Sequence, residues 1–547
     1  MVILQKTVGQ VVKEQAMHNP ETEAYVYPEH GIRKTYKEFD DETDRLAKAF
    51  IGIGIEKGEH VAIWSDNKRE WLLSQFATGK MGGVLVTVNT SYQSSELEYL
   101  LEQSDATTLI LGEEFKGTNY IDILNTVCPE LATAEKGQIK SAKLPHFKRV
   151  IVMSNNSYPG IYTWTEFEDF AEKVSDFEFE ERFHSMQPDD VINIQYTSGT
   201  TGFPKGVMLT HLNVVNNGNL VGDTMSLTEK DRLCIPVPFF HCFGCVLGTM
   251  AAVTHSTTMI IAEQFEPKRV LQMVQDEKCT GLHGVPTMFI AELNHPEFSS
   301  FDTSTLRTGI MAGSSCPIEV MKKVITDMGA SDITIAYGQT ESSPVITQTR
   351  ADDDIEKRVS TVGKPHTEVE VKIIDPATGE VVEIGIPGEL CTRGYHVMKG
   401  YYKNEEATKT AVDREGWLHT GDIAVQDEED YIAITGRIKD MVIRGGENIY
   451  PREIEEFLYQ HPSIQDVQVV GVPDPKYGEE LMAWVILKKG EQLSVEELKA
   501  YCKGKISRHK IPRYIEFTKE YPMTASGKIQ KFKLRELSVE HSQQTEV

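Results

Sequence analysis

Short apolar runs alternate with helical stretches along the first two thirds of the chain, and this alternation constrains the fold more than any other feature. Residues 60–64, 84–88 and 107–111 have the short β-rich character of strands, and 71–77 and 96–102 between them have helical periodicity. Strands that alternate with helices form βαβ units with parallel strands, so we expect an α/β fold. The alternation returns in a second block, with a helix from 211, a strand at 259–261, a helix at 270–274 and a strand at 280–285.

The character of the sequence changes at about Thr361, where short strands separated by turns take over. Strands are predicted at 369–374, 388–393 and 431–435. The residues Asp375-Pro376-Ala377-Thr378-Gly379 form a clear turn directly after the first of them. This part of the chain is expected to form a small β-barrel-like subdomain.

A second boundary is expected near residues 436–440, and a compact mixed α+β unit follows it. Its predicted elements are helices at 452–460 and 496–505 and strands at 467–472, 481–487 and 514–517. The unit has about 110 residues, a normal domain size. We therefore predict a large N-terminal domain, residues 1–436, made of two βαβ subdomains and the β-rich subdomain, and a small C-terminal domain, residues 437–547.

The chain is acidic, with a formal net charge of −26 over 547 residues, which argues against nucleic acid and anionic membranes as partners. It begins without the pattern of a signal peptide, and no apolar run reaches the roughly 18 residues of a membrane span. Eight scattered cysteines are typical of a reducing compartment, so we expect a cytoplasmic location. Cys242 and Cys245 form a single CxxC pair, which is better explained by buried thiols than by a metal site.

A loop rich in glycine and hydroxyl side chains follows the apolar run 191–195. Backbone N–H groups and hydroxyls in such a loop can bind an anion, and a lysine at its end adds a mobile positive charge. Phosphate is the expected ligand, although the spacing of Gly199 and Lys205 does not fit a Walker A loop. An ordinary polar surface loop is the alternative. The residues concerned are Thr197, Ser198, Gly199, Thr200, Thr201, Gly202 and Lys205.

Several residues further along have side chains suited to a magnesium–nucleotide complex. The ring of Tyr337 could stack on adenine, and Asp422 could accept hydrogen bonds from two ribose hydroxyls. Arg437 could donate to the ribose or a phosphate, while Thr340 and Glu341 offer the hard oxygen atoms that Mg²⁺ prefers. Each has an ordinary alternative: a core tyrosine, a turn-stabilising aspartate, a surface salt bridge or a solvated glutamate.

Two further candidates gain their meaning from context. Lys528 lies at the tip of the tight turn Ala525-Ser526-Gly527-Lys528, where a lysine is usually just solvated. His241 lies between aromatic residues, where a histidine is usually packed in the core. A basic patch on this acidic chain could meet the 3′-phosphate of CoA, but a solvated helix end explains it at least as well. It consists of Lys505, Arg508, His509, Lys510 and Arg513.

Seven segments, taken together and in order, closely resemble the adenylate-forming superfamily of acyl-CoA synthetases, peptide-synthetase adenylation domains and luciferases. The resemblance covers nearly the whole chain, and the last segment is most similar to the short- to medium-chain fatty-acid-CoA ligases. The segments are 196–206, Phe239-Phe240-His241-Cys242-Phe243-Gly244, Met311-Ala312-Gly313-Ser314-Ser315-Cys316-Pro317, Tyr337-Gly338-Gln339-Thr340-Glu341, Trp417-Leu418-His419-Thr420-Gly421-Asp422, 436–448 and Pro522-Met523-Thr524-Ala525-Ser526-Gly527-Lys528-Ile529.

The resemblance implies a role for the charged candidates. Lys528 would reach from a small, mobile domain into the large-domain site and bind the substrate carboxylate and the α-phosphate, where a compact ammonium suits the growing charge. Glu341 would hold Mg²⁺, while Asp422 and Arg437 would bind the ribose. Lys205 would act with Lys528 in the same step.

The resemblance also implies where the acyl group and CoA bind. Lys439 would be the hinge of the small domain, and Gly445 and Gly446 would approach the pantetheine thiol. His241 would line the acyl channel near the carboxylate. The apolar pocket would also include the segment 283–289 and Val345. Gly313, Ser314 and Gly338 are further expected binding residues.

Together these features predict an ATP-dependent fatty acyl-CoA ligase. A carboxylic acid would attack Mg·ATP to form acyl-AMP and pyrophosphate, and the CoA thiolate would then displace AMP. Short- to medium-chain fatty acids are the expected substrates, and a monomer or homodimer is expected. The alternatives are an enzyme that loads a carrier-protein thiol and a catalytically silent nucleotide-binding protein on the same scaffold.

Overall fold

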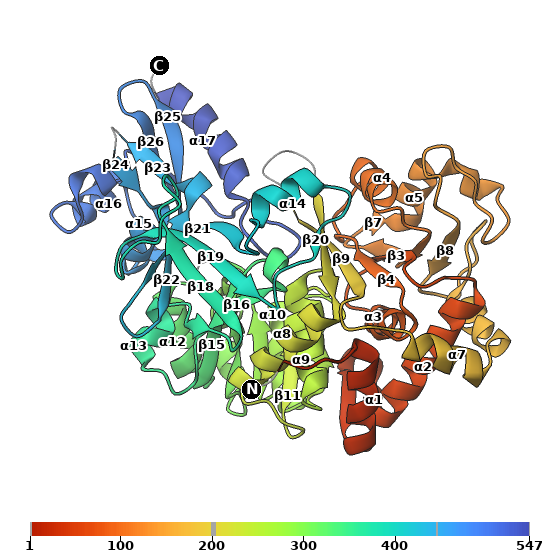
Figure 1. Ribbon diagram of the computed structural model, residues 1–547. Helices are drawn as coiled ribbons and strands as arrows, with labels where there is room; N and C mark the ends of the chain where they lie inside the picture. The colour runs from red at the N-terminus through yellow and green to blue at the C-terminus, as the bar shows by residue number, and fades with distance from the viewer. Residues whose placement is uncertain (1–2, 198–203, 315, 445–446, 546–547) are drawn as a thin grey trace.

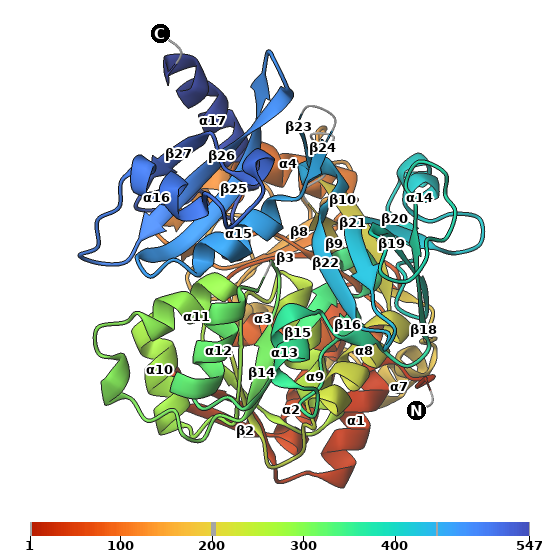
Figure 2. The same ribbon diagram turned by 90° about the vertical axis from the view of Figure 1, so that its left-hand side faces the viewer.

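The structure, a computed structural model, describes residues 3–197, 204–314, 316–444 and 447–545. Of the predicted binding residues, 198–202 and the pair Gly445 and Gly446 lie outside the described residues. The α/β fold is confirmed, with two large sheets, a small antiparallel sheet and a smaller C-terminal domain. That domain, blue in Figures 1 and 2, lies above the green middle part of the chain in both views.

The first βαβ block forms a seven-stranded sheet in the order β20-β10-β9-β4-β3-β5-β8. The strands β9, β4, β3, β5 and β8 are parallel, whereas β10 pairs antiparallel with both β9 and β20. The predicted helices are α3 (Arg69–Met81) and α4 (Ser94–Gln103). The strands are β3 (His60–Trp64), β4 (Val84–Thr87), β5 (Thr108–Leu111), β8 (Arg149–Val152), β9 (Val191–Thr197), β10 (Lys205–Thr210) and β20 (Gly400–Tyr401).

The second block forms a nine-stranded sheet in the order β17-β16-β15-β14-β13-β11-β12-β1-β2. Buried residues of both sheets, such as Val61 and Leu233, belong to one continuous core. The strands are β1 (Glu23–Tyr27), β2 (Ile32–Thr35), β11 (Arg232–Ile235), β12 (Thr258–Ile261), β13 (Gly281–Gly284), β14 (Thr308–Met311), β15 (Asp332–Gly338), β16 (Val345–Gln348) and β17 (Lys364–Pro365). The helices of this region include α8 (His211–Thr224), α10 (Pro267–Asp276), α11 (Pro286–Leu293) and α12 (Ile318–Asp327).

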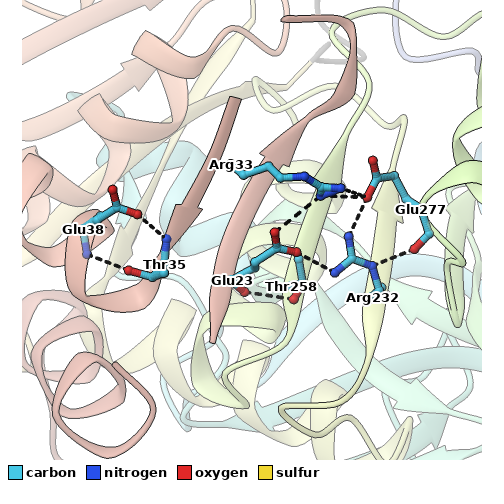
Figure 3. A network of polar contacts seen from close by, with 7 residues as sticks. All are labelled: Glu23, Arg33, Thr35, Glu38, Arg232, Thr258 and Glu277. Atoms are coloured by element: carbon cyan, nitrogen blue, oxygen red, sulfur yellow. Dashed lines mark hydrogen bonds and ion pairs between the residues drawn. The ribbon is translucent and has the colours of Figure 1, made fainter. Parts of the chain in front are cut away.

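The N-terminal hairpin β1–β2 lies at one edge of this sheet, and a network of polar and charged side chains ties it to the neighbouring elements (Figure 3). Strand β1 pairs in parallel with β12, and Thr258 donates its hydroxyl to the carbonyl of Glu23. The guanidinium of Arg232 lies 2.7 Å from Glu23 and 2.6 Å from Glu277. Arg33 of the hairpin also lies 2.6 Å from Glu277, so one carboxylate joins two strands through two arginines. The helix that follows the hairpin, α2 (Tyr36–Gly52), begins with a Thr35–Glu38 capping box.

The β-rich region is a four-stranded antiparallel sheet in the order β18-β19-β21-β22. Its strands are β18 (Val369–Ile374), β19 (Gly388–Gly394), β21 (Leu418–Gln426) and β22 (Ile432–Arg437). In the described part of the chain β18 and β22 are its edges, so the barrel-like subdomain takes the form of an open sheet. Strand β22 ends at Arg437, where a short helical turn over Ile438–Asp440 leads into the C-terminal residues.

The C-terminal residues form the expected α+β unit with its own core, which includes Val442, Ile454 and Leu481. The second predicted helix is shorter than expected: α16 (Val495–Cys502) ends before 505 because Gly504, at φ +78°, turns the chain. The other elements are β23 (Val442–Arg444), β24 (Glu447–Ile449), α15 (Pro451–Tyr459), β25 (Ile464–Asp474), β26 (Gly478–Leu487), β27 (Tyr514–Phe517) and α17 (Lys531–Thr545). The division at 436/437 stays a prediction.

Candidate active site

The turn that carries Lys528 is closed by its own hydrogen bonds and docks on the large domain. The Thr524 N–H donates to the Lys528 carbonyl at 2.7 Å, and Gly527 has φ +79°. The hydroxyl of Thr287, in α11, donates to the carbonyl of Gly527 at 2.9 Å. A Cβ atom on Gly313 would lie only 3.2 Å from Lys528 Cε, and at φ +93° a side chain there would also be strained. The glycine therefore leaves room for the lysine.

Lys528 and His241 meet although they come from different domains. Lys528 Nζ lies 3.2 Å from His241 Nε2, and His241 Nδ1 accepts the N–H of Phe243 at 3.1 Å. Burial holds the pKa of His241 well below its usual range and also lowers the pKa of Lys528. A neutral histidine whose Nδ1 accepts a hydrogen bond carries its proton on Nε2. Two donors therefore converge on one point, an arrangement suited to an anionic oxygen.

Lys205 and Glu341 are brought together by a residue that sequence reasoning did not select, Tyr401. The Tyr401 hydroxyl donates to Glu341 Oε1 at 2.8 Å, and Lys205 Nζ lies 4.6 Å from the centre of the Tyr401 ring. Thr340 is buried, and its hydroxyl lies 3.8 Å from the thiol of Cys242, next to His241. The signal for Tyr401 was weak, because one tyrosine in a Gly-Tyr-Tyr segment is unremarkable without its contacts.

The predicted ribose and adenine residues form a third group. Asp422 Oδ2 accepts the Tyr337 hydroxyl at 2.7 Å, and Asp422 Oδ1 lies 3.0 Å from Arg437 Nε. Asp422 is only 4% exposed, and burial raises the pKa of its carboxyl although Arg437 and Tyr337 oppose the shift. Burial likewise keeps the pKa of the Tyr337 phenol well above its usual range. The hydroxyl of Tyr337 is therefore a donor to the carboxylate.

The loop of Asp422 is supported from the neighbouring strand β19. Glu389 accepts the N–H of Gly421 at 3.0 Å through Oε1 and lies 3.0 Å from His419 Nδ1 through Oε2. Cys391 completes a cluster whose possible ligand atoms all lie within 4.8 Å of one another. The hydrogen bonds of Glu389 to Gly421 and His419 account for these contacts as support for the loop that carries Asp422.

The other predicted residues lie at strand ends, at exposed positions or in the core. Gly338 ends β15 at a point where a Cβ atom would lie 1.8 Å from the Pro344 carbonyl, so only glycine fits. Thr197 is the last residue of β9, and Gly313 and Ser314 are exposed. Cys242 and Cys245 are both buried, and burial raises the pKa of Cys242 to about 11, in keeping with the thiols expected there.

The predicted hinge is held by the last helix. Arg535 of α17 donates to the Lys439 carbonyl at 3.3 Å and lies 2.7 Å from Asp440 Oδ1. Burial lowers the pKa of Lys439. Two residues of the predicted basic patch have acidic partners in their own domain. Lys510 pairs with Glu453 at 2.5 Å, and Arg513 pairs with Asp474 at 2.8 Å. Both interpretations of the patch, a contact to CoA and a solvated helix end, stay predictions.

The chain is similar to known proteins over nearly its whole length. Residues 12–402 match the family described as AMP-binding enzyme, and residues 453–528 match the AMP-binding enzyme C-terminal domain. A Bacillus subtilis (strain 168) protein provisionally named acyl-CoA synthetase YngI is 60% identical over 98% of both chains. The medium-chain acyl-CoA ligase ACSF2, mitochondrial, of Homo sapiens is 43% identical over 98% of this chain and 88% of its own length.

Solved structures are similar over the same extent. The anthranilate CoA ligase AuaEII in complex with anthranoyl-AMP has a TM-score of 0.86 and 26% identity, covering 98% of each chain. ATP-bound MatB from Rhodopseudomonas palustris has a TM-score of 0.84 and 26% identity, covering 98% of this chain and 99% of that one. In the described part of this chain, no helix combines the length and apolar character needed to cross a bilayer. From its sequence matches and its fold, the chain belongs to the AMP-binding enzyme family.

Proposed function

We propose that this protein is an ATP-dependent acyl-CoA ligase that forms an acyl-adenylate and then transfers the acyl group to CoA. The observation that carries the proposal is the contact of Lys528 with His241, 3.2 Å apart. The thiol of Cys242, next to His241, lies 3.8 Å from the hydroxyl of Thr340, the neighbour of Glu341. The charges of Glu341 and Arg437 both act on the pKa of Lys528, so these groups lie within electrostatic range of the lysine. Relatives named as acyl-CoA ligases over nearly the whole chain support the same reaction.

In the first step an oxygen of the substrate carboxylate would lie beside the pair, within hydrogen-bond distance of both Lys528 Nζ and His241 Nε2. Both atoms are donors, and a carboxylate oxygen accepts from both. The oxygen would attack the α-phosphorus of ATP, and the bond from that phosphorus to the bridging oxygen would break to release pyrophosphate. Lys528 would then stabilise the charge that grows on the α-phosphate oxygens. This step depends on positioning and electrostatics more than on covalent participation of the protein.

The nucleotide would be bound by the third group of residues. The Tyr337 ring offers a flat surface to adenine, while Asp422 would exchange its contacts with Tyr337 and Arg437 for ribose hydroxyls. Lys205 and the loop that precedes it would hold the β- and γ-phosphates, which leave as pyrophosphate. Backbone N–H groups and hydroxyls of the residues Thr197 to Gly202 would supply the remaining donors.

The donor set around Glu341 fits a magnesium ion. In the described residues, Glu341 Oε1 has a protein partner, Tyr401, and Oε2 has none, which leaves one hard oxygen for a metal. Thr340 adds a hydroxyl oxygen beside it. When bound, Mg²⁺ would neutralise phosphate charge and so favour departure of pyrophosphate.

The second step requires a different face of the small domain. We propose that the domains divide at residues 436/437 and that rotation about Lys439 withdraws Lys528 and brings Gly445 and Gly446 to the pantetheine thiol. The CoA thiolate would attack the acyl carbonyl, and AMP would leave. The contact of Arg535, in α17, with the Lys439 carbonyl supports a boundary just before this residue, because α17 packs on β25 of the small domain.

Short- to medium-chain fatty acids are the proposed substrates, supported by the name of the ACSF2 relatives. Pyrophosphate release should be measured with straight-chain acids of increasing length, with CoA, with a carrier protein, and without an acceptor. A maximum at short or medium chains together with CoA-dependent turnover is expected. Turnover with the carrier protein alone would favour the carrier-loading alternative, and no pyrophosphate release with any acid would favour the silent one. The cytoplasmic location and the monomer or homodimer stay predictions, which fractionation and light scattering would test.

A further inference from the structure

Tyr401 contacts two of the predicted catalytic residues at once, although neither the sequence pattern nor the family assignment singles it out. It lies in β20, the edge strand that pairs antiparallel with β10, and its direct partner in the register is Val207. Strand β10 begins at Lys205. The tyrosine is therefore fixed by backbone pairing to the strand that carries the phosphate-loop lysine.

The segment that contains Tyr401 holds Glu341 at two points. The N–H of Met398 donates to the Glu341 backbone carbonyl at 2.9 Å, and the Tyr401 hydroxyl donates to Glu341 Oε1 at 2.8 Å. Tyr401 is itself anchored, because its N–H donates to the Thr408 hydroxyl at 2.9 Å and its side chain is buried.

The face of the same ring supports Lys205. The ammonium lies 4.6 Å from the ring centre, within the range of a cation–π contact. One face of the phenol thus orients the lysine, and its hydroxyl orients the carboxylate. The hydroxyl and the ring act on different partners, so the two contacts can be removed separately.

We propose that Tyr401 is a positioning residue for adenylation, which directs Glu341 Oε2 toward the metal of the metal–ATP complex and Lys205 toward its terminal phosphates. This inference rests on the proposed function, because it assigns Glu341 and Lys205 to the metal and the phosphates. Groups that orient a metal ligand typically change metal affinity or activity by about 10- to 100-fold when they are removed. A tyrosine that only fills the core would not change metal dependence selectively.

The test uses the full-length protein and measures binding rather than turnover. Titrations of ATP, with EDTA or with increasing Mn²⁺, would be followed by calorimetry and by the paramagnetic resonance signal of free Mn²⁺. Y401F keeps the ring and removes the hydroxyl, whereas Y401L removes both. The matched control is Y402F, because the neighbouring Tyr402 donates its hydroxyl to Asp105 at 2.9 Å and contacts neither Glu341 nor Lys205 in the described structure.

We expect Y401F to raise the Mn²⁺ concentration needed for half-saturation of the ATP complex by about 10-fold or more, with metal-free ATP binding unchanged. Y401L should also weaken metal-free ATP binding, since it removes the support of Lys205. In an E341Q background Y401F should have no further effect on Mn²⁺ dependence. Circular dichroism would establish that the Y401F and Y402F proteins are folded.

Two results would overturn the inference. One is a Y401F protein whose Mn²⁺ dependence equals that of Y402F, and the other is a Y401F protein that loses metal-free and metal-dependent ATP binding equally. Measurements of ATP binding and pyrophosphate release on the wild-type protein distinguish failure of this inference from failure of the proposed function. Binding of Mn·ATP without pyrophosphate release for any acid would overturn the ligase reaction alone, and absence of ATP binding would overturn both.

Discussion

Lys528 Nζ lies 3.2 Å from His241 Nε2, although 287 positions separate the two residues in the chain. The contact exists because the turn of Gly527 docks on Thr287 of the large domain. His241 presents an N–H and Lys528 an ammonium, so an oxygen anion placed beside the pair would accept from both donors. The structure thus has the lysine in contact with the large domain, which is the arrangement that the proposed adenylation step needs.

Replacing Lys528 by alanine should abolish acyl-AMP formation and spare the second half-reaction. Loss of a donor aimed at developing charge costs about 100-fold or more in rate. Pyrophosphate exchange measures the first step, and conversion of supplied acyl-AMP to acyl-CoA measures the second. K533A is the control, since Lys533 lies over the ring of Phe532 near the same end of the chain. Equal loss of both half-reactions in K528A would contradict the assigned role.

Replacing Asp422 by asparagine should weaken nucleotide binding. The change removes the charge that Tyr337 and Arg437 contact and that the ribose hydroxyls would use. Hydrogen bonds to charged groups contribute about 1.5–3 kcal/mol, which corresponds to an increase of about 10- to 100-fold in the KM for ATP. E429Q serves as the control, because the Glu429 side chain is exposed and lies 3.5 Å from Lys357. An unchanged KM for ATP in D422N would refute the ribose assignment.

Acid should destabilise this protein at pH values where many proteins are still stable. Burial lowers the pKa of His211, His366 and His396 to about 3 and that of His283 to about 4. Below the ordinary histidine pKa of about 6.5 the unfolded chain binds protons that the folded chain does not. The contribution of each histidine to the free energy of unfolding is therefore complete above pH 6.5. It falls as the pH falls toward 3, by up to about 1.4 kcal/mol per pH unit for each histidine.

The measurement is the urea midpoint between pH 7.5 and pH 4.5. Buried carboxyls act in the opposite direction, because burial raises the pKa of Asp466 to about 6 and also raises the pKa of Glu292 and Asp422, so the expected slope is smaller than the histidines alone would give. H211Q should reduce the slope, while H184Q, at an exposed position, should leave it unchanged. A midpoint that stays constant from pH 6.5 to pH 4.5 would show that these histidines are protonated in the folded protein.

Replacing Arg232 by alanine should loosen the N-terminal hairpin. The guanidinium joins Glu23 of β1 to Glu277, and its removal leaves both half-buried carboxylates without that partner. We expect a loss of about 2 kcal/mol in unfolding free energy and faster amide exchange in β1 and β2. R269A is the control, because the exposed pair of Arg269 and Glu29 should contribute less than about 1 kcal/mol. Equal effects of the two substitutions would mean that the network adds nothing beyond surface pairing.

The local features of the fold were readable from the sequence, whereas its distant pairings were not. The runs 60–64 and 84–88 became β3 and β4 because periodicity reports local structure directly. The strand β1 was not predicted although residues 23–27 are β-rich, and its parallel pairing with β12, more than 200 residues away, leaves no local signal. Helix α16 ended early for a local reason, the turn at Gly504, that the pattern did not resolve.

The candidate site shows the same division between local motifs, which the sequence reveals, and contacts between distant segments, which it does not. Lys528, Glu341 and Asp422 were found through ordered motifs, each of which is modest when taken singly. Their spatial grouping depends on contacts between segments hundreds of residues apart, which periodicity cannot report. Tyr401 was missed because its importance lies wholly in two contacts, one to Glu341 and one to Lys205.

The parallel pairing of β1 with β12 has a consequence for synthesis of the protein. A ribosome produces Glu23–Tyr27 long before Thr258–Ile261, so the hairpin must wait for its partner strand to emerge. During that interval the nascent chain carries a hairpin with one unpaired edge, which is the kind of surface that pairs with other chains. Translation speed and chaperone supply over the first 260 residues should therefore affect the yield of soluble protein more than events near the C-terminus.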